Sequence, residues 1–390
     1  MQPTLTPRKL AQPAAARGGR GAPPKFKSFT VLANVTNPSL NRDSCSSVKF
    51  GDKVFWTCRD TSVVLDNGSY FGLWASSAGW TEFAADGTPA FERGGSSRIG
   101  PGSTGTNTIL PMKGPSPTVP LFYPLAPDMS PGAGCCDDGS RWVGWPDSPP
   151  LVTDTAPDGT ITAYTWVTKT HLRGLAVDNA EQPTTLYRVT YKPTDDLDVL
   201  PTVEAVDYEF WPANKPRYGT CGNLVRDGYV YLYGELKKEG FCSPVGLARV
   251  PVSEVENKSC YEFFINGRWT RDLPDISDKA AVVNNAGAGG QGTYYYSERH
   301  GLYIWIGQGY PSVCADFYMT TASRPEGPWA EPRLLCSAEN GNAPLGGYSL
   351  QAHPHLLRAE DNGIYVTWTQ NFATPEPGEY VTPMAYIAWQ

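Results

Sequence analysis

A pattern of paired strand-like segments recurs along the chain and most constrains its fold. Each copy consists of a strand, a turn that contains glycine, and a second strand rich in aromatic residues. The copies are centred on Gly51, Gly159, Gly228, Gly301 and Gly363, and the last four are spaced 62 to 73 residues apart. No segment past the N-terminus shows sustained helical periodicity. The sequence therefore predicts an all-β protein built from five similar units.

A further strand candidate follows the later hairpins, at residues 185–191, 245–252, 315–323 and 384–390. Four strands per unit, repeated around an axis, are typical of a β-propeller. We therefore expect a five-bladed β-propeller in a single domain, with a strand at residues 28–33 completing the last blade and closing the ring. The alternative is a β-sandwich with irregular loops.

Two segments of unusual composition suggest where the folded domain begins and where it contains an insertion. Residues 1–27 are basic and rich in proline, alanine and glycine, so we expect a flexible arm there and the propeller over residues 28–390. The first interval between hairpins is longer than the others, and the excess lies at about residues 84–150, which are dense in glycine, proline and serine. This stretch is predicted to be a long loop insertion over one face.

Charge and hydropathy narrow the classes of partner. The net charge is −7, and clusters of Lys and Arg are missing beyond the N-terminal arm. Both observations argue against nucleic acid or an anionic membrane surface. No segment is long and apolar enough to span a membrane. A small-molecule or glycan ligand fits better, with no cofactor, and the oligomeric state is not predicted.

Nine cysteines occur without a Cys-x-x-Cys or a Cys/His metal spacing, so we expect disulfides, one leftover thiol and no metal. Proximity within a repeat favours Cys221 with Cys242 and Cys314 with Cys336; Cys135, Cys136 and Cys260 stay unassigned.

The cysteines and the glycosylation sequons also indicate where the protein is located. Together with three glycosylation sequons, at Asn34, Asn67 and Asn257, the cysteines indicate a glycoprotein in the secretory pathway. However, residues 1–27 lack the apolar core of a signal peptide, which leaves a cytoplasmic location open.

The first hairpin, residues 42–61 (RDSCSSVKFGDKVFWTCRDT), carries the candidate chemistry. If Gly51 and Asp52 form a two-residue turn, Cys45 lies opposite Cys58 and Asp43 opposite Asp60. Both pairs then occupy non-hydrogen-bonded positions on one face, where Cα atoms are about 4.5 Å apart. That spacing suits a disulfide, whereas two carboxylates so close raise one pKa. A glycosidase needs one protonated and one ionised carboxyl, although Asp43 could simply cap a loop and Asp60 end a strand.

Other candidates come from the first strand of each later unit, because innermost propeller strands surround the central channel. We expect substrate contacts from Asp147, Asn223, Tyr294, Gln351 and His353, with Trp142, Trp145 and Tyr348 stacking on sugar faces. Two have structural alternatives: Asp147 could be a turn residue, and His353 could be hydrogen-bonded within the core.

The motifs together resemble a known family. The hairpin RDSCSSVKFGDKVFWTCRDT is similar to the opening motif of DUF4185-type five-bladed propellers, and GWPDSPPLV, YGTCGNLVRDGYVYLYG, YMTTASRPEGPWAEP and AHPHLLRAEDNGIYVTWTQN follow in order over residues 41–371. The resemblance implies a glycoside hydrolase that cuts D-arabinan with an Asp pair, here Asp43 and Asp60. Two departures stand out: Ser44 replaces the usual glycine after the first Asp, and Cys-Arg-Asp-Thr replaces Phe-Gly-Asp-Thr at residues 58–61. Arg59 points to the other strand face, so it need not pair with Asp60.

Three functions remain as hypotheses. The first is a glycoside hydrolase with Asp43 and Asp60 as acid and nucleophile or base. The second is a fungal secondary-metabolism pericyclase of the hetero-Diels-Alderase type, which needs an aromatic pocket for an apolar polyene and a hydrogen-bond donor that polarises a carbonyl. The third is a carbohydrate-binding propeller without turnover.

Overall fold

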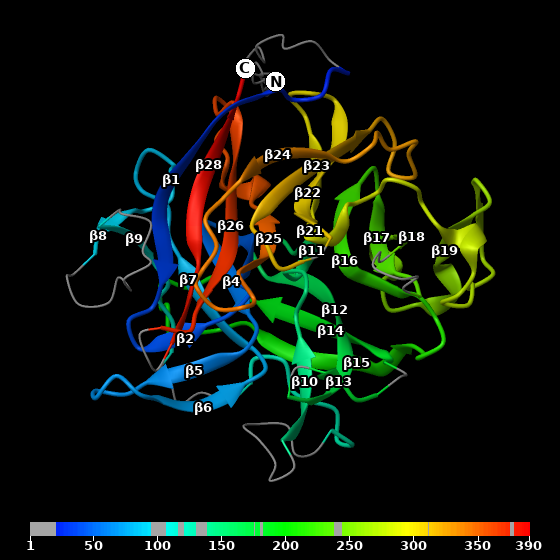
Figure 1. Cartoon of the computed structure of the whole chain (residues 1–390). Helices are drawn as coiled ribbons and strands as arrows, with labels where there is room; N and C mark the ends of the chain where they lie inside the picture. Colours follow the sequence, from blue (N-terminus) through cyan, green and yellow to red (C-terminus); the bar gives the residue numbers. More distant parts are fainter. Residues whose placement is uncertain are drawn as a thin grey trace, which may run out of the picture.

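The fold consists almost entirely of short strands arranged around a common centre (Figure 1). A computed structural model describes residues 21–94, 107–115, 121–129, 139–174, 176–179, 182–237, 244–310, 312–374 and 378–390. The helical elements of this described part are single 3-10 turns, η1 (Val252–Glu254), η2 (Lys258–Cys260), η3 (Lys279–Ala281) and η4 (Pro354–Leu356). None of them is long enough to cross a membrane. The all-β prediction is confirmed.

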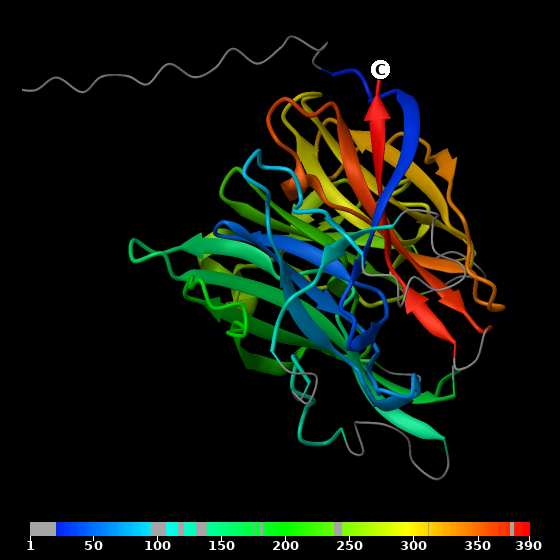
Figure 2. The same ribbon diagram turned by 90° about the vertical axis from the view of Figure 1, so that its left-hand side faces the viewer.

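The two ends of the chain meet in one sheet, as the sequence predicts. Strand β1 (Phe26–Thr36) pairs antiparallel with β28 (Pro383–Trp389), and the two run side by side in Figure 2. The pairing tethers both termini to one sheet. The other strands of this sheet are β25 (Gly347–Ala352), β26 (Gly363–Phe372), β27 (Glu379–Val381), β9 (Thr108–Pro111) and β8 (Glu92–Arg93).

Three further sheets follow the predicted repeats. Each is built around a hairpin whose turn contains one of the anchor glycines. The first contains β10 (Ser140–Trp145), β11 (Leu151–Thr155), β12 (Ile161–Arg173), β13 (Ala176–Val177), β14 (Thr184–Tyr191) and β15 (Thr202–Trp211). The second contains β16 (Arg217–Arg226), β17 (Tyr229–Glu235), β18 (Val245–Pro251), β19 (Glu262–Ile265) and β20 (Arg268–Thr270). The third contains β21 (Gly289–Ser297), β22 (Leu302–Gly309), β23 (Asp316–Ala322) and β24 (Arg333–Ser337).

The first hairpin differs from the later ones because its chain is divided between two small sheets. One contains β3 (Ser46–Phe50), β4 (Lys53–Cys58) and β7 (Ser77–Thr81), and the other β2 (Leu40–Arg42), β5 (Thr61–Val64) and β6 (Tyr70–Trp74). The chain crosses between them at residues 43–45 and 59–60, where both Asp residues lie. The strand-to-strand transition therefore places Asp43 and Asp60 outside any regular ladder.

The core fills the spaces between neighbouring sheets with aromatic side chains. Trp166 of β12 is fully buried against Gly219 of β16, where a Cβ atom would lie 2.7 Å from the indole. Gly219 also has a φ of 94°, so both the contact and the backbone require glycine there. Burial of each such side chain contributes about 2 to 3 kcal/mol.

Several expectations about the chain's organisation need correction. Strand β1 begins at Phe26, two residues inside the predicted arm, and Gly21 already hydrogen-bonds to the His300 carbonyl. The predicted loop at about 84–150 contains β8, β9 and β10, because β9 pairs in parallel with β1 and extends its sheet.

The cysteine pairings were also partly wrong. Cys336 has a free thiol, so the predicted disulfide with Cys314 is not formed; the two residues lie near the start of β23 and in β24, and Cys314 instead donates to Asp316. Cys135, Cys136 and Cys242 lie outside the described residues, and Cys260 is a free thiol.

Candidate active site

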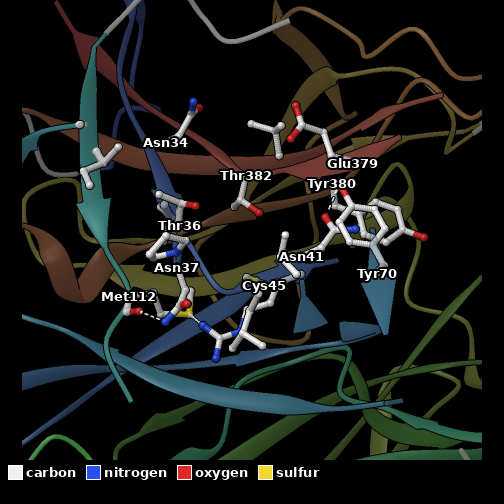
Figure 3. Close-up of a pocket in the computed structure, with 18 residues that line it drawn as sticks. Asn34, Thr36, Asn37, Asn41, Cys45, Tyr70, Met112, Glu379, Tyr380 and Thr382 are labelled. Atoms are coloured by element: carbon white, nitrogen blue, oxygen red, sulfur yellow. Dashed lines mark hydrogen bonds between the residues drawn. The ribbon is translucent and has the colours of Figure 1, made fainter. Parts of the chain in front are cut away.

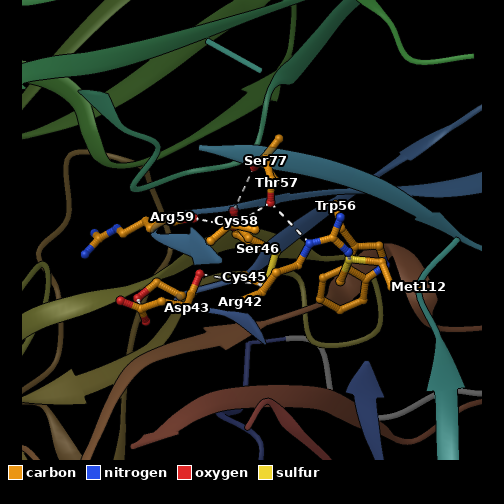
Figure 4. Close-up of a disulfide and its surroundings, with 12 residues drawn as sticks. Arg42, Asp43, Cys45, Ser46, Trp56, Thr57, Cys58, Arg59, Ser77 and Met112 are labelled. Carbon is orange, nitrogen blue, oxygen red and sulfur yellow. Dashed lines mark hydrogen bonds between the residues drawn. A yellow bond between two sulfur atoms is a disulfide. The ribbon is translucent and has the colours of Figure 1, made fainter. Parts of the chain in front are cut away.

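The register of the first hairpin is the one that a turn at Gly51 and Asp52 predicts. Phe50 pairs with Lys53, and the ladder continues outward to a disulfide between Cys45 and Cys58, whose Cα atoms are 4.0 Å apart (Figure 4). The predicted disulfide is thus confirmed. It links the strand ends at the point where the chain leaves the hairpin.

Asp43 and Asp60 do face each other past the disulfide, but the expected ladder position was wrong. The Asp43 amide donates to the Asp60 carbonyl at 2.9 Å, and the Arg59 amide donates to the Asp43 carbonyl at 2.8 Å. Arg59 and Asp60 together oppose Asp43, which is a bulge and a hydrogen-bonded position. Ser44 has a φ of 50°, a conformation that favours glycine, and this turns the chain after Asp43.

The Asp60 carboxylate is held by a bidentate ion pair. Arg141 of β10 donates through Nη1 to Oδ1 at 2.9 Å and through Nη2 to Oδ2, and the Trp145 indole N–H donates to Oδ1 at 2.9 Å. The side chains of Asp60 and Arg141 are 9% and 13% exposed. Fork-to-fork pairing of this kind fixes the plane of the carboxylate and adds geometric specificity to the contact.

The Asp43 carboxyl lies in a different environment. It is 9% exposed, its Oδ1 lies 2.6 Å from the Ser44 hydroxyl, and it is hydrogen-bonded to Tyr348 of β25. Burial raises the pKa of Asp43 to about 6, although Ser44 and Arg59 oppose the increase and Asp60 adds to it. Burial thus favours a proton on Asp43, whereas Asp60 is engaged by the Arg141 guanidinium.

Arg59 completes the charged group from the strand opposite Asp43. As the strand alternation predicts, its guanidinium does not pair with Asp60; it forms an ion pair with Asp147, which follows β10. In Figure 4 the side chains of Arg59 and Asp43 extend to one side of the hairpin, and Arg42 extends to the other. Gln291 of β21 donates to Asp147 Oδ1 at 3.0 Å. Side chains from four sheets thus meet at the Asp pair.

The remaining predicted residues are divided between the site and the core. Trp145 lies in the site, with Arg59 and Arg141 over its ring at 5.6 and 5.7 Å. Trp142 lies on the opposite face of β10 and packs against His171 at 4.6 Å, because successive strand residues alternate. Tyr294 is core: its ring stacks on Tyr233 at 3.6 Å and its hydroxyl donates to a backbone carbonyl.

Three further predicted residues lie around the inner strands. Gln351 is 4% exposed and accepts from Thr293 at 2.7 Å. Asn223 of β16 has a buried amide nitrogen without a protein partner. His353 is fully buried between Ser47 at 2.7 Å and Thr367 at 2.8 Å, and burial holds its pKa well below the usual range. Its environment matches the structural alternative.

Sequence reasoning missed Arg141, Gln291, Ser349 and Tyr380. For Arg141 a signal was present, since residues 141 and 145 lie on the same face of one strand. Gln291, Ser349 and Tyr380 come from later sheets and carried no local signal. Among the described residues, no group of three His, Cys, Asp or Glu side chains could hold a metal ion.

A cavity of about 390 Å³ lies beside this charged group (Figure 3). It is lined by a mixture of polar, aromatic and aliphatic side chains, with Tyr70 and Tyr380 on one side and Asn34 and Thr36 on the other. Asn34 is 5% exposed and its Oδ1 atom has no protein partner, so the sequon at this position is buried in the folded state. Tyr380 lines this cavity, and burial together with the nearby Asp43 and Asp60 raises its pKa.

Comparisons with known proteins agree with this architecture. The family described as "Domain of unknown function (DUF4185)" matches residues 180–380. No curated protein matches the chain. Among solved structures, a protein from Bacteroides ovatus provisionally named a hydrolase superposes with a TM-score of 0.56 at 14% identity, covering 88% of this chain and 85% of its own; this likeness shows a shared fold.

Two other solved structures resemble the chain more distantly. A GH43_1 enzyme from Xanthomonas citri has a TM-score of 0.47 at 12% identity, covering 92% of each chain. A family 117 glycoside hydrolase from Zobellia galactanivorans has a TM-score of 0.46 at 10% identity, covering 94% of this chain and 90% of its own. These TM-scores are too low to carry an argument about function.

Proposed function

The chain belongs to the DUF4185 family, and on that premise we propose that it is a glycoside hydrolase-like enzyme on a five-bladed propeller. Asp43 would act as the general acid and Asp60 as the nucleophile or base. In this proposal the first blade contains β3, β4 and β7, and the sheet of β2, β5 and β6 is an accessory. The Cys45–Cys58 disulfide supports a secreted location.

The contrast between the two carboxyls carries this proposal. Asp60 is held as a carboxylate by Arg141, whereas burial raises the pKa of Asp43 to about 6. Glycosidic bond cleavage needs this combination, because one group must protonate the leaving oxygen while the other attacks or activates water. The separation of roles also supports Asp43 as the acid, since it is the group that can carry a proton near neutral pH.

The substrate would approach from the cavity of Figure 3. Its volume of about 390 Å³ suits one or two sugar units, and Tyr380, which lines it, also interacts with Asp43 and Asp60. The half-buried rings of Trp145 and Tyr348 would provide stacking faces at the reacting bond. The family resemblance makes an arabinan-like glycan the first substrate to test.

Turnover of defined arabinan fragments by Asp43→Asn and Asp60→Asn tests the proposal. Both variants should lose about 10²- to 10⁴-fold or more in kcat, because each removes a proton-transfer or nucleophilic group. Asp52→Asn is the matched control: Asp52 occupies the turn of the same hairpin with a side chain 82% exposed, and its activity should match wild type. Unchanged turnover in either site variant would refute the role of the pair.

A second function has one specific observation in its favour. An apolar cavity of about 380 Å³ lies between Trp74, Leu121 and Phe122, and Arg42 also lines it. Arg42 is 8% exposed, and burial lowers its pKa to about 10. No acidic side chain in the described part of the chain pairs with it, and it is held by Ser77, Met112 and the Ala78 carbonyl. A buried donor beside an apolar cavity supports the pericyclase alternative, in which a polyene carbonyl is polarised.

The two candidates respond differently to the same variants. A pericyclase would retain most of its activity in Asp43→Asn but lose it in Arg42→Met, since no proton passes between acids. A glycosidase would lose turnover in Asp43→Asn; because Arg42 also lines the cavity of Figure 3, Arg42→Met would raise its KM and leave most of its kcat. Cyclisation of a polyene substrate and hydrolysis of a glycan, measured on both variants, separate them.

A further inference from the structure

A continuous chain of direct polar contacts joins Asp43 to Asp147. Asp43 Oδ1 lies 2.6 Å from the Ser44 hydroxyl, which lies 2.7 Å from the Ser349 hydroxyl of β25. The Ser349 hydroxyl lies 2.7 Å from Gln291 Oε1, and Gln291 Nε2 lies 3.0 Å from Asp147 Oδ1. These side chains come from separate sheets of the molecule, so their alignment is a property of the tertiary structure.

The number of hydrogens available to these four polar contacts shows that one carboxyl must be protonated. The chain contains four contacts, and each needs one hydrogen between its two heavy atoms. The two serine hydroxyls provide one hydrogen each, and the Gln291 amide provides one. Three hydrogens cannot fill four contacts. The fourth must come from a carboxylic acid at one end, either Asp43 or Asp147.

Charge decides which end holds that hydrogen. Asp147 forms an ion pair with Arg59, which favours its ionised form, and this turns the Gln291 amide nitrogen toward it. Gln291 then presents its oxygen to Ser349, so Ser349 donates to Gln291 and Ser44 donates to Ser349. The charges of the surrounding group agree: among the described residues, the carboxyls of Asp43, Asp60 and Asp147 are matched by two guanidinium groups, those of Arg59 and Arg141.

We propose that Asp43 rests as a carboxylic acid whose hydrogen is held by the chain Ser44–Ser349–Gln291, with the ion-paired Asp147 fixing its direction. Ser349 and Gln291 are then positioning residues for the acid. The catalytic consequence rests on the proposed function. During cleavage the Asp43 O–H bond breaks, its proton passes to the leaving-group oxygen, and the electron pair remains on Asp43. The Ser44 hydroxyl then rotates to donate to the new carboxylate.

Other groups facing Asp43 set the pH at which it titrates. Arg59 and the hydrogen bond from Tyr348 favour the ionised form, whereas burial and Asp60 favour the acid. Arg141 is neutralised by its pairing with Asp60, and Tyr380 of β27 faces both carboxyls without a charge of its own. None of these groups provides the missing hydrogen between Asp43 and Ser44, so removal of Ser349 isolates the contribution of the chain.

Infrared difference spectroscopy tests the proton assignment directly, without a substrate. Between about pH 4 and 7, wild type minus Asp43→Asn should contain the carbonyl band of a protonated carboxyl that disappears with a midpoint near pH 6. Ser349→Gly removes the hydroxyl at a position whose φ of 53° already suits glycine, and Ser349→Ala is a second variant. In both, Ser44 becomes free to donate to ionised Asp43, so proton affinity should fall about 10-fold, a midpoint shift of about one pH unit.

A buried serine outside the chain provides the matched control. Ser46 is 3% exposed and its hydroxyl makes a 3.4 Å contact with Thr57 only, so Ser46→Ala should leave the midpoint unchanged. A Ser349 variant with the wild-type midpoint, or a band that belongs to Asp147 instead, would overturn the proposal. The measurement needs no turnover, so the midpoint shift can be observed even if the protein hydrolyses no glycan. If the protein is an active glycosidase but the Ser349 variants show no shift, the hydrogen-bonded chain Ser44–Ser349–Gln291 is rejected and the proposed function is retained.

Discussion

Two polar clusters lie against the first hairpin and behave in opposite ways. The acid cluster contains Asp43, Asp60, Asp147, Arg59 and Arg141; the histidine cluster contains Ser47, His353, His355 and Thr367. Both contain groups that the sequence or the structure nominates for chemistry. In the histidine cluster burial is the main cause that keeps both rings neutral: it lowers the pKa of His355 to about 3 and holds that of His353 well below its usual value, with smaller contributions from Lys49 and from the neighbouring ring.

The acid cluster differs because its carboxyl groups outnumber their guanidinium partners, and because its hydroxyl and amide hydrogens are too few for its polar contacts. Asp60 is held by Arg141, whereas burial raises the pKa of Asp43 to about 6. A fully satisfied neutral network rigidifies a core, whereas a site for acid-base chemistry needs groups whose protonation can change near the working pH. The difference suggests that buried titratable residues of this protein take part in chemistry where two neighbours have different protonation states.

The largest expected difference between the clusters concerns the Asp60–Arg141 pair. Asp60→Asn leaves the Arg141 guanidinium buried without its counter-ion, so the free energy of unfolding should fall by about 3 to 5 kcal/mol. Asp43→Asn should change it by about 1 kcal/mol or less at pH 5, because the native side chain is already neutral there. Urea unfolding of both variants measures this, with Asp52→Asn as control. Equal losses in the two variants would remove the asymmetry between the carboxyls.

The second difference is the pH dependence of stability. Asp43 has a folded pKa of about 6 against an ordinary value of 3.8, so its contribution is complete below 3.8 and is lost as pH rises through 6, about 3 kcal/mol in total. His353 and His355 have lowered pKa values, so their contribution is present above 6.5 and is lost as pH falls.

Removal of Asp43 should therefore expose the histidine contribution. Between pH 4 and 7, the free energy of unfolding of Asp43→Asn should rise more steeply with pH than that of wild type. Chemical denaturation at several pH values measures the two slopes. A shallower slope in the variant would contradict the raised pKa of Asp43.

A smaller effect is expected within the histidine cluster. Thr367→Val removes the hydroxyl that contacts His353 Nε2 at 2.8 Å and leaves a buried ring nitrogen unsatisfied. This should cost about 1 to 3 kcal/mol of unfolding free energy and leave kcat unchanged. Thermal denaturation and a turnover assay on one preparation check both. A stable variant with reduced kcat would place His353 in the site and contradict the assignment of this cluster to the core.

The smallest effect concerns Ser44. Ser44→Gly relieves the cost of a serine at a φ of 50° but loses the hydrogen bond to Asp43, so the net change in unfolding free energy should lie within about 1 kcal/mol. The replacement restores the glycine expected from the family motif. Its test is a comparison of melting temperatures, and a loss well above 1 kcal/mol would show that the hydroxyl also supports the fold.

The local features of the chain were predictable because short-range geometry determines them. The turn at Gly51 and Asp52 fixes the register of the first hairpin, and that register alone places Cys45 against Cys58 and Asp43 near Asp60. The strands of the later repeats and the pairing of the first strand with the last followed from the same periodicity. Even here the ladder was predicted one step too far, since a bulge at Arg59 lies beyond the disulfide.

What the sequence could not decide is which side chains from different sheets meet. Strand alternation determines that Trp142 and Trp145 point to opposite faces, but only the packing of sheets turns Trp145 toward Asp60. The same packing brings Arg141, Gln291 and Ser349 to the Asp pair and encloses Tyr294 and His353 in the core. Sequence alone determined the hairpin and its two carboxyls, because a turn and a period of two are local properties. The tertiary structure decided their protonation states, because desolvation and ion pairing depend on neighbours far away in the chain.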